Sequence, residues 1–294
     1  MTMIFGVPLI GILGQLMLGL VNGSFYALLS LGLAIIFGLL GVVNFAHGAF
    51  YTLGAFAAAV ALSWLGIGYW PSLILSPIVV GIVGIVSERL FLRHLYRLDP
   101  LYGLLLTFGL ALMIQGLLFQ EFGSSGTTYP VPEPLHGVWN LGFMILPIYR
   151  GWVIAASITI CFTAWYLIER TPLGATLRAA TENAPLLQAF GVNVPLIVAL
   201  TYGGGVALAA LAGVLSAPVI QVNPQMGQSM VIVVFAVVVI GGMGSILGSI
   251  VSGLALGVIE GLTKVYYPEA SNVVVFIIMA LVLILRPAGL FGRG

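Results

Sequence analysis

Residues 9–42 read LIGILGQLMLGLVNGSFYALLSLGLAIIFGLLGV and contain no charged side chain. As an α-helix this stretch would extend about 50 Å, whereas about 20 residues are enough to cross the hydrocarbon core of a bilayer. The dipeptide Asn22-Gly23, which is typical of turns, interrupts the apolar pattern. We therefore expect 9–42 to form either one tilted membrane helix or a half-helix followed by a full one.

The composition extends this expectation to the whole chain of 294 residues. Hydrophobic residues make up 61% of it, charged residues make up only 6%, and the mean hydropathy is +1.20. Soluble domains carry about 25% charged residues, so a surface this poor in charge requires lipid around it. The net charge of +1 and the lack of a polybasic run give no reason to expect nucleic acid as a partner.

The N-terminal sequence does not have the pattern of a cleaved signal peptide. A secretory signal begins with a positively charged region, and the first Arg or Lys of this chain is Arg89. We therefore expect residues 1–20 to be mature membrane sequence. The single cysteine, Cys161, lies in an apolar stretch and is interpreted as a small buried residue.

Apolar stretches of membrane length recur along the chain. We expect helices near 9–42, 44–65, 69–87, 101–119, 152–168, 196–216, 229–250, 252–263 and 271–286. The sequence therefore predicts an all-α fold, a polytopic transmembrane bundle of about eight to ten helices in a single domain over residues 1–294. The stretch 252–263 would be only about 18 Å long as a helix, so it is predicted either to cross or to be a re-entrant or broken element.

Positive charges indicate the orientation of this bundle. Seven of the nine Lys and Arg residues fall in three regions, namely Arg89, Arg93 and Arg97, then Arg170 and Arg178, then Arg286 and Arg293. The positive-inside rule predicts that these regions, including the C-terminus, are cytoplasmic. The loop 120–150 would then be external, and its Gly, Ser, Thr and Pro content predicts an irregular segment without a helix.

The segment 169–195 is the most informative of the predicted cytoplasmic regions. Its apolar residues recur at helical spacing, and Asn183 and Pro185 suit the cap and first turn of a second short helix. Two amphipathic helices too short to span are expected either to lie at the lipid interface or to dock a cytoplasmic partner. The residues assigned to that contact are Leu173, Leu177, Arg178, Ala180, Glu182, Ala184, Leu187, Phe190 and Gly191.

Polar residues inside apolar stretches are candidates for a transport pathway, because an ionisable group at the bilayer centre costs about 2.5–3.5 kcal/mol on insertion scales. Glu260 is the clearest case, and Lys264, four residues later, is close enough to pair with it along a helix. A structural ion pair is the alternative. The other candidates are Asn22, Asn44, His47 and Gln115, each of which could instead cross-link helices.

Glycine spacing predicts close helix packing late in the chain. Gly244 and Gly248 are four residues apart, as are Gly253 and Gly257, so each pair is expected to lie on one helix face. The run GGMGSILGS at 241–249 lacks the Lys-Ser/Thr of a phosphate-binding loop, so ATP hydrolysis by this chain is not expected. No group of side chains has metal-ligand spacing, and we predict neither a metal nor a cofactor.

Several ordered strings resemble one family of transport proteins. The string GLLGVVNFAHG at 38–48 resembles a block found in branched-chain amino acid ABC-transporter permeases of the LivH type. Other strings are similar to the same family: NGSFYAL at 22–28, the coupling segment between Arg178 and Asn193, FAVVVIGGMGS at 235–245, GVIE at 257–260 and RPAGLFG at 286–292. The resemblance covers essentially the whole chain.

The resemblance implies a permease subunit of an ATP-driven, binding-protein-dependent importer in the bacterial inner membrane. Its expected partners are a second related permease, two cytoplasmic ATP-binding subunits that contact 169–195, and a periplasmic or lipid-anchored solute-binding protein. The implied substrates are leucine, isoleucine and valine, although similar permeases serve urea, short amides or other amino acids. Ala49 and Pro185 depart from the family pattern, which limits inference about substrate and coupling.

Two other classes of protein remain as alternatives. A passive channel would need no partner, and the short helix pair in 169–195 would have no evident purpose in it. An intramembrane enzyme is less favoured, because the acidic residues form no close pair and the three histidines are scattered over three regions.

Overall fold

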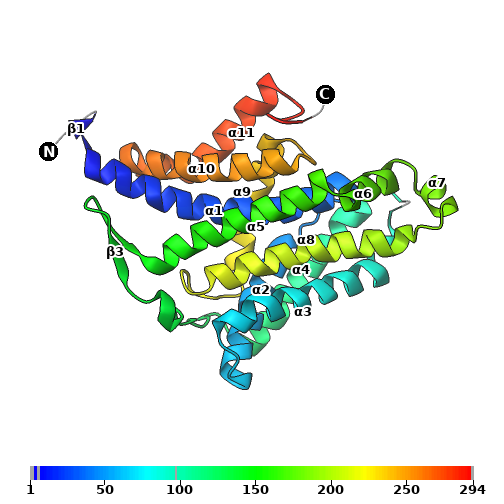
Figure 1. The fold of residues 1–294 in the computed structure, drawn as a ribbon, viewed down its shortest axis with the longest axis horizontal. Helices are drawn as coiled ribbons and strands as arrows, with labels where there is room; N and C mark the ends of the chain where they lie inside the picture. The colour runs from blue at the N-terminus through cyan, green and yellow to red at the C-terminus, as the bar shows by residue number, and fades with distance from the viewer. Residues whose placement is uncertain (1–2, 5–6, 97, 293–294) are drawn as a thin grey trace.

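The computed structural model describes residues 3–4, 7–96 and 98–292 of the chain (Figure 1). The described residues form eleven α-helices, two small antiparallel hairpins and three short 3-10 helices. The helices are α1 (Leu9–Leu40), α2 (His47–Leu65), α3 (Tyr69–Leu90), α4 (Pro100–Phe122), α5 (Ile148–Arg170), α6 (Pro172–Glu182), α7 (Ala184–Ala189), α8 (Val194–Ser216), α9 (Met226–Gly241), α10 (Ile246–Tyr266) and α11 (Val274–Leu285). The strands are β1 (Met3–Ile4), β2 (Val7–Pro8), β3 (Val138–Asn140) and β4 (Ile145–Pro147).

Seven of the described helices, α1 to α5, α8 and α10, are long and apolar enough to cross a membrane. Helices α9 and α11 are also apolar but shorter. Several long helices, including α1, α5, α8 and α10, run side by side along the long axis of the molecule (Figure 1). The prediction of an all-α, polytopic transmembrane bundle is confirmed.

The N-terminal stretch forms one continuous helix, α1, which has 32 residues and no break at Asn22-Gly23. The alternative of a half-helix followed by a full helix is therefore wrong. Gly23 packs directly against α10, where a Cβ atom would come 2.9 Å from the carbonyl oxygen of Leu254. Glycine at this position therefore serves close helix packing and does not form a turn. The helix ends at Gly41, whose φ of 66° is in the left-handed region that favours glycine.

The boundary between α9 and α10 differs from the sequence prediction. Instead of helices at 229–250 and 252–263, α9 ends at Gly241 and α10 runs over 21 residues from Ile246. The prediction that 252–263 is short, re-entrant or broken is wrong. The turn between the helices contains Gly242 and Gly244, whose φ values are 101° and 88°. Gly244 therefore lies outside the helix and does not share a helix face with Gly248.

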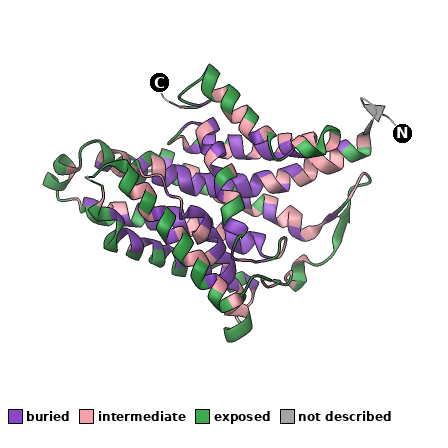
Figure 2. Ribbon diagram, turned by 180° about the vertical axis from the view of Figure 1, so that it is seen from behind, coloured by how far each residue is buried: buried purple, intermediate pink, exposed green. Residues whose placement is uncertain are grey.

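Helices α1 and α10 pack antiparallel with very close backbone approach. Gly19 and Gly23 of α1 face Gly253 and Gly257 of α10, and a Cβ atom at Gly19 would lie 2.5 Å from the carbonyl oxygen of Gly257. Small residues permit such close contact between helices. In a lipid bilayer the hydrophobic effect does not drive helices together, so van der Waals contacts of this kind contribute much of the stability. Figure 2 shows that the buried residues concentrate along this central part of the bundle.

Helix α2 begins inside the bundle and not at its end. Its first residue, His47, packs against the middle of α1 and α8. A Cβ atom at Gly32 of α1 would lie 3.0 Å from Cε1 of the His47 ring and 2.6 Å from the carbonyl oxygen of Gly205 in α8. Further along, Gly54 lies against Ala210 of α8. The non-helical segment 41–46 therefore carries the chain from the end of α1 back to the interior.

The segment between α4 and α5 contains more regular structure than predicted. It is shorter than 120–150, because α4 continues to Phe122 and α5 begins at Ile148. Strands β3 and β4 pair as an antiparallel hairpin within it. A 3-10 helix at Glu133–Leu135 also contradicts the prediction that the loop holds no helix.

The Arg-containing regions that the structure describes lie together at one end of the bundle. One cavity there brings Arg178 together with Gly38 and Phe291, and a neighbouring cavity joins Leu40 to the loop after α3, which carries Arg93. Arg97 and Arg293 lie outside the described residues. The opposite end carries Tyr267, directly after α10, and the hairpin formed by β3 and β4.

The contact between the α1 and α10 backbones, which we call the α1–α10 seam, predicts that two glycine substitutions differ strongly in their effect on stability. Gly257→Leu should lower the free energy of unfolding by about 1–3 kcal/mol, because its side chain must displace the backbone of α1. Gly109→Leu in α4 is the matched control, since nothing lies within 4 Å of a Cβ atom there. Melting of the detergent-purified protein measures both, and equal melting temperatures would contradict the seam.

Candidate functional site

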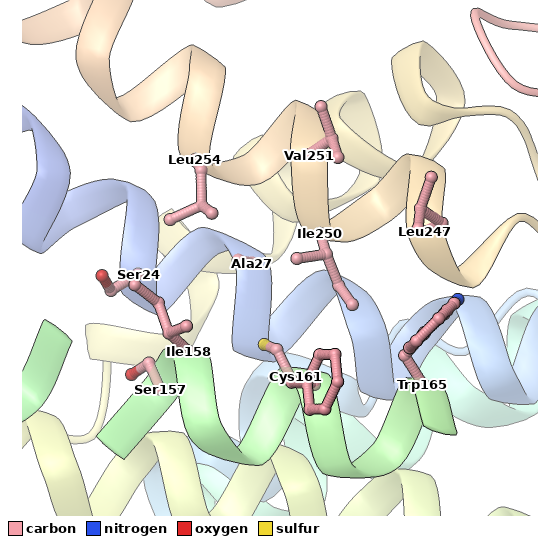
Figure 3. A pocket seen from close by; sticks show the side chains of 11 residues that line it. Ser24, Ala27, Ser157, Ile158, Cys161, Trp165, Leu247, Ile250, Val251 and Leu254 are labelled. Carbon is pink, nitrogen blue, oxygen red and sulfur yellow. The ribbon is translucent and has the colours of Figure 1, made fainter. Parts of the chain in front are cut away.

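A cavity of about 270 Å³ lies between α1, α5 and α10 (Figure 3). Helix α1 contributes Ser24 and Ala27, and the other two helices form its sides. The lining residues from α5 and α10 are Ser157, Ile158, Cys161, Phe162, Trp165, Leu247, Ile250, Val251 and Leu254. No charged side chain from the described part of the protein lines the cavity, so it suits an aliphatic group.

The surface of the cavity is almost wholly apolar, although two serines lie beside it. The hydroxyl-bearing side chains of Ser24 and Ser157 lie at one end, Trp165 and Leu247 lie at the other, and Ile250 lies between them (Figure 3). Ser24 Oγ donates a hydrogen bond to the carbonyl oxygen of Leu20 at 2.8 Å, whereas Ser157 Oγ is buried without a hydrogen-bond partner. Because both serines are buried, their hydroxyls contribute almost nothing to the surface that a molecule in the cavity would meet.

The helices beside the cavity expose apolar side chains. Phe162 of α5 has 62% of its surface exposed, and Ile158, Leu247 and Val251 are exposed as well. An exposed apolar patch on a membrane protein faces either lipid or another protein. Because these residues also line the cavity, whatever covers the patch would form its remaining wall.

Glu260 lies at the α1–α10 seam and not in the cavity. The hydroxyl of Tyr26 donates to Glu260 Oε2 at 2.7 Å, and Lys264 Nζ lies 2.5 Å from Glu260 Oε1. The expected pairing with Lys264 along the helix is present. The carboxylate is buried and has a partner on each oxygen, which is the arrangement expected for the structural ion pair that the sequence left as an alternative.

Asn44 and His47 are fully buried at the start of α2. Asn44 Oδ1 accepts a hydrogen bond from the backbone nitrogen of Ala46 at 3.1 Å, and His47 Nε2 lies 2.9 Å from the carbonyl oxygen of Leu29. These contacts fix the non-helical segment 41–46 and join it to α1. Neither residue lines the cavity between α1, α5 and α10.

The two remaining pathway candidates are also outside that cavity. Asn22 is half-buried on α1, and Gln115 of α4 lines a separate cavity of about 60 Å³ together with Thr52 and Gln228. The structure therefore does not bring the five predicted pathway residues together. Among the described residues, no three His, Cys, Asp or Glu side chains are grouped as metal ligands.

The segment 169–195 forms the expected pair of short helices, α6 and α7. Asn183 Oδ1 accepts from the backbone nitrogen of Leu186 at 3.0 Å, which caps α7, and Gly191 has a φ of 84° where the chain turns away. Arg178 donates to the carbonyl oxygen of Ile168 at 3.1 Å. The hydrogen bond from Arg178 ties α6 to the end of α5.

Part of the predicted contact face on α6 is covered by the chain itself. Ala180 is buried and Leu177 packs against the hydrophobic core, so Leu177 is a poor position at which to test partner binding. The most exposed apolar side chains of the segment are Phe190 at 77%, Leu173 at 56% and Leu186 at 55%. Of the other assigned residues, Glu182 and Gly191 are exposed, and Arg178, Ala184 and Leu187 are half-buried.

Comparison with known proteins decides the family. The family described as "Branched-chain amino acid transport system / permease component" matches residues 1–283. The chain belongs to this family of membrane permeases. The permease is 32% identical to the high-affinity branched-chain amino acid transport system permease protein BraD of Pseudomonas aeruginosa, over 96% of each chain.

Two further relatives carry related names. LivH of Escherichia coli K12, a high-affinity branched-chain amino acid transport system permease protein, is 30% identical over 96% of each chain. LivM of Salmonella typhimurium, described in the same words, is 26% identical over 90% of the permease and 67% of LivM. The resemblance noted in the sequence is thereby confirmed at the level of the family.

The sequence did not identify the residues of the cavity. Ser157, Cys161 and Trp165 recur at a spacing of four on α5, which is a signal for one helix face, but such a face is common in membrane helices. Polar residues within apolar stretches, such as Glu260 and His47, were the predicted pathway candidates, and they do not line this cavity. Those groups proved to be fully embedded between helices.

The contacts of Glu260 predict that its substitution affects stability and not substrate choice. Glu260→Gln removes the charge opposite Lys264 and should lower the free energy of unfolding by about 1–3 kcal/mol. Glu121→Gln, at an exposed position on α4, should change it by less than about 0.5 kcal/mol. Thermal melting and the ratio of leucine to valine uptake check this, and an altered ratio with unchanged melting would contradict it.

Proposed function

We propose that this permease carries leucine, isoleucine and valine across the bacterial cytoplasmic membrane as one subunit of an ATP-driven importer. The observation that carries the proposal is the aliphatic lining of the cavity between α1, α5 and α10. The family and the names of BraD and LivH support the same substrates. Urea and short amides are disfavoured, because they have no branched aliphatic group to bury against this lining.

A second, related permease closes the open side of the cavity in this proposal. The exposed apolar side chains of Phe162 and Val251 beside the cavity provide a contact surface. The similarity to both LivH and LivM supports a pair of related permeases. The substrate then moves between two subunits, and each contributes one wall.

Two cytoplasmic ATP-binding subunits supply the energy, and a periplasmic or lipid-anchored solute-binding protein delivers the substrate. The end of the bundle that carries Arg93 and Arg178 faces the cytoplasm, and the C-terminus lies on that side. There α7 presents Leu186 and the residue that directly follows it presents Phe190, both exposed apolar side chains suited to an ATP-binding subunit. A passive channel would leave them without a partner.

Uptake measurements test the substrate assignment. Cells that carry the complete transporter should take up radiolabelled leucine, isoleucine and valine, and they should not take up urea or acetamide through it. Uptake of urea or acetamide in preference to the three amino acids would contradict the proposal.

The docking assignment predicts the effect of a charge at the tip of α7. Phe190→Asp should reduce the amount of ATP-binding subunit that co-purifies with the permease by about tenfold or more, because a central apolar anchor is lost. Tyr267→Asp is the matched control, since Tyr267 is 74% exposed at the opposite end of the bundle. Equal co-purification of both variants would contradict docking at Phe190.

A further inference from the structure

The hairpin of β3 and β4 presents an apolar outward face. Its register pairs Val138 with Pro147 and Trp139 with Leu146, and residues opposite each other in an antiparallel pair lie on the same face. Leu146 is buried, so the face that it shares with Trp139 is turned toward the protein. The outward face carries Val138 and Ile145, which are 58% and 65% exposed (Figure 2). An apolar strand face left open to water would be unfavourable, so this face needs a partner.

The hairpin lies at the level where a membrane helix begins. Strand β4 ends at Pro147, and α5 starts at the next residue, Ile148 (Figure 1). The backbone nitrogen of Ile148 donates to the carbonyl oxygen of Gly137 at 3.1 Å, and the ring of Trp139 packs where a Cβ atom at Gly151 would stand. Because α5 is long and apolar enough to cross a membrane, its first turn is expected at a bilayer boundary.

A group of aromatic side chains marks the same level independently. Trp152, in the first turns of α5, donates from Nε1 to the hydroxyl of Tyr69 at 2.9 Å, and its ring centroid lies 5.3 Å from that of Trp70. Tyr69 and Trp70 are the first two residues of α3, another membrane-length helix. Trp and Tyr are enriched at the headgroup level of membrane proteins. The starts of both helices, and Trp139 beside them, therefore share one interface level.

The chemistry of the hairpin favours lipid over a soluble protein as its partner. No charged residue occurs between Glu133 and Arg150, whereas surfaces that bind soluble proteins usually have a polar, charged rim. Asn140, the polar residue of the outward face, uses its Oδ1 to accept from the backbone nitrogen of Gly142 at 2.9 Å. The outer strand edges still carry backbone groups that hydrocarbon could not satisfy. The headgroup region offers both apolar contact and hydrogen-bond partners.

We infer that the hairpin formed by β3 and β4 is a membrane-surface anchor, which places Val138 and Ile145 among the lipid headgroups and the adjoining acyl carbons. The anchor holds the start of α5, one wall of the cavity between α1, α5 and α10, at a fixed level in the bilayer. This role is separate from the proposed function, since it depends neither on the substrate nor on the source of energy.

The test places an environment-sensitive fluorophore in turn on two exposed residues of the same segment. Ile145→Cys puts it on the outward face, and Glu133→Cys, on the 3-10 helix, is the matched control. Cys161 is buried, so the unsubstituted chain is the labelling blank. Each full-length variant is held in phosphatidylcholine nanodiscs that contain some phosphatidylcholine spin-labelled near its headgroup. The spin-labelled lipid should quench the fluorophore at Ile145→Cys at least about threefold more than at Glu133→Cys.

Iodide, a quencher confined to water, should show the opposite order. Equal quenching by the spin-labelled lipid at both positions would overturn the inference, and so would stronger quenching by iodide at Ile145→Cys than at Glu133→Cys. Shielding of Ile145→Cys from iodide only after a solute-binding protein is added would also overturn it, because the face would then bind protein. Val138→Cys, on the same outward face, repeats the measurement, so that a folding defect of one variant does not decide the result.

Discussion

The close antiparallel contact between α1 and α10 is the interaction on which the rest of the structure depends. Lipid offers no hydrophobic drive for helices to associate, so their association relies on packing and on hydrogen bonds. Glycines on both helices allow the backbones to touch, and the Tyr26–Glu260–Lys264 group adds hydrogen bonds near one end of the seam. This pair of helices then serves as a fixed wall against which α5 lies.

The cavity between α1, α5 and α10 follows from that arrangement. Helix α5 covers α1 only in part, and the space left beside α10 is the cavity of about 270 Å³ with its aliphatic lining. The exposed apolar faces next to it and the exposed tip at Phe190 belong to different ends and sides of the molecule. In the proposed function, an ATP-binding subunit contacts the chain at Phe190, away from the cavity, so its motion must be transmitted through the helices between them.

The sequence predicted the fold class well, because an apolar chain with 6% charged residues can only be stable as a helical bundle in lipid. It placed the boundary between α9 and α10 wrongly, since glycine is common inside membrane helices and only the positive φ values of Gly242 and Gly244 show the turn there. The short helices α6 and α7 were predictable from caps and from Gly191. The cavity was not, because Ile250 and Leu254 look like ordinary membrane residues until three helices meet around them.

The central claim is that this permease conducts branched-chain amino acids only when other chains supply the energy. Liposomes that contain the permease, its related partner and the ATP-binding subunits, with the solute-binding protein outside and MgATP inside, test it most directly. The account predicts that radiolabelled leucine accumulates against its gradient, and that removal of the ATP-binding subunits abolishes this uptake. Leucine flux through liposomes that contain the purified permease alone would contradict the account.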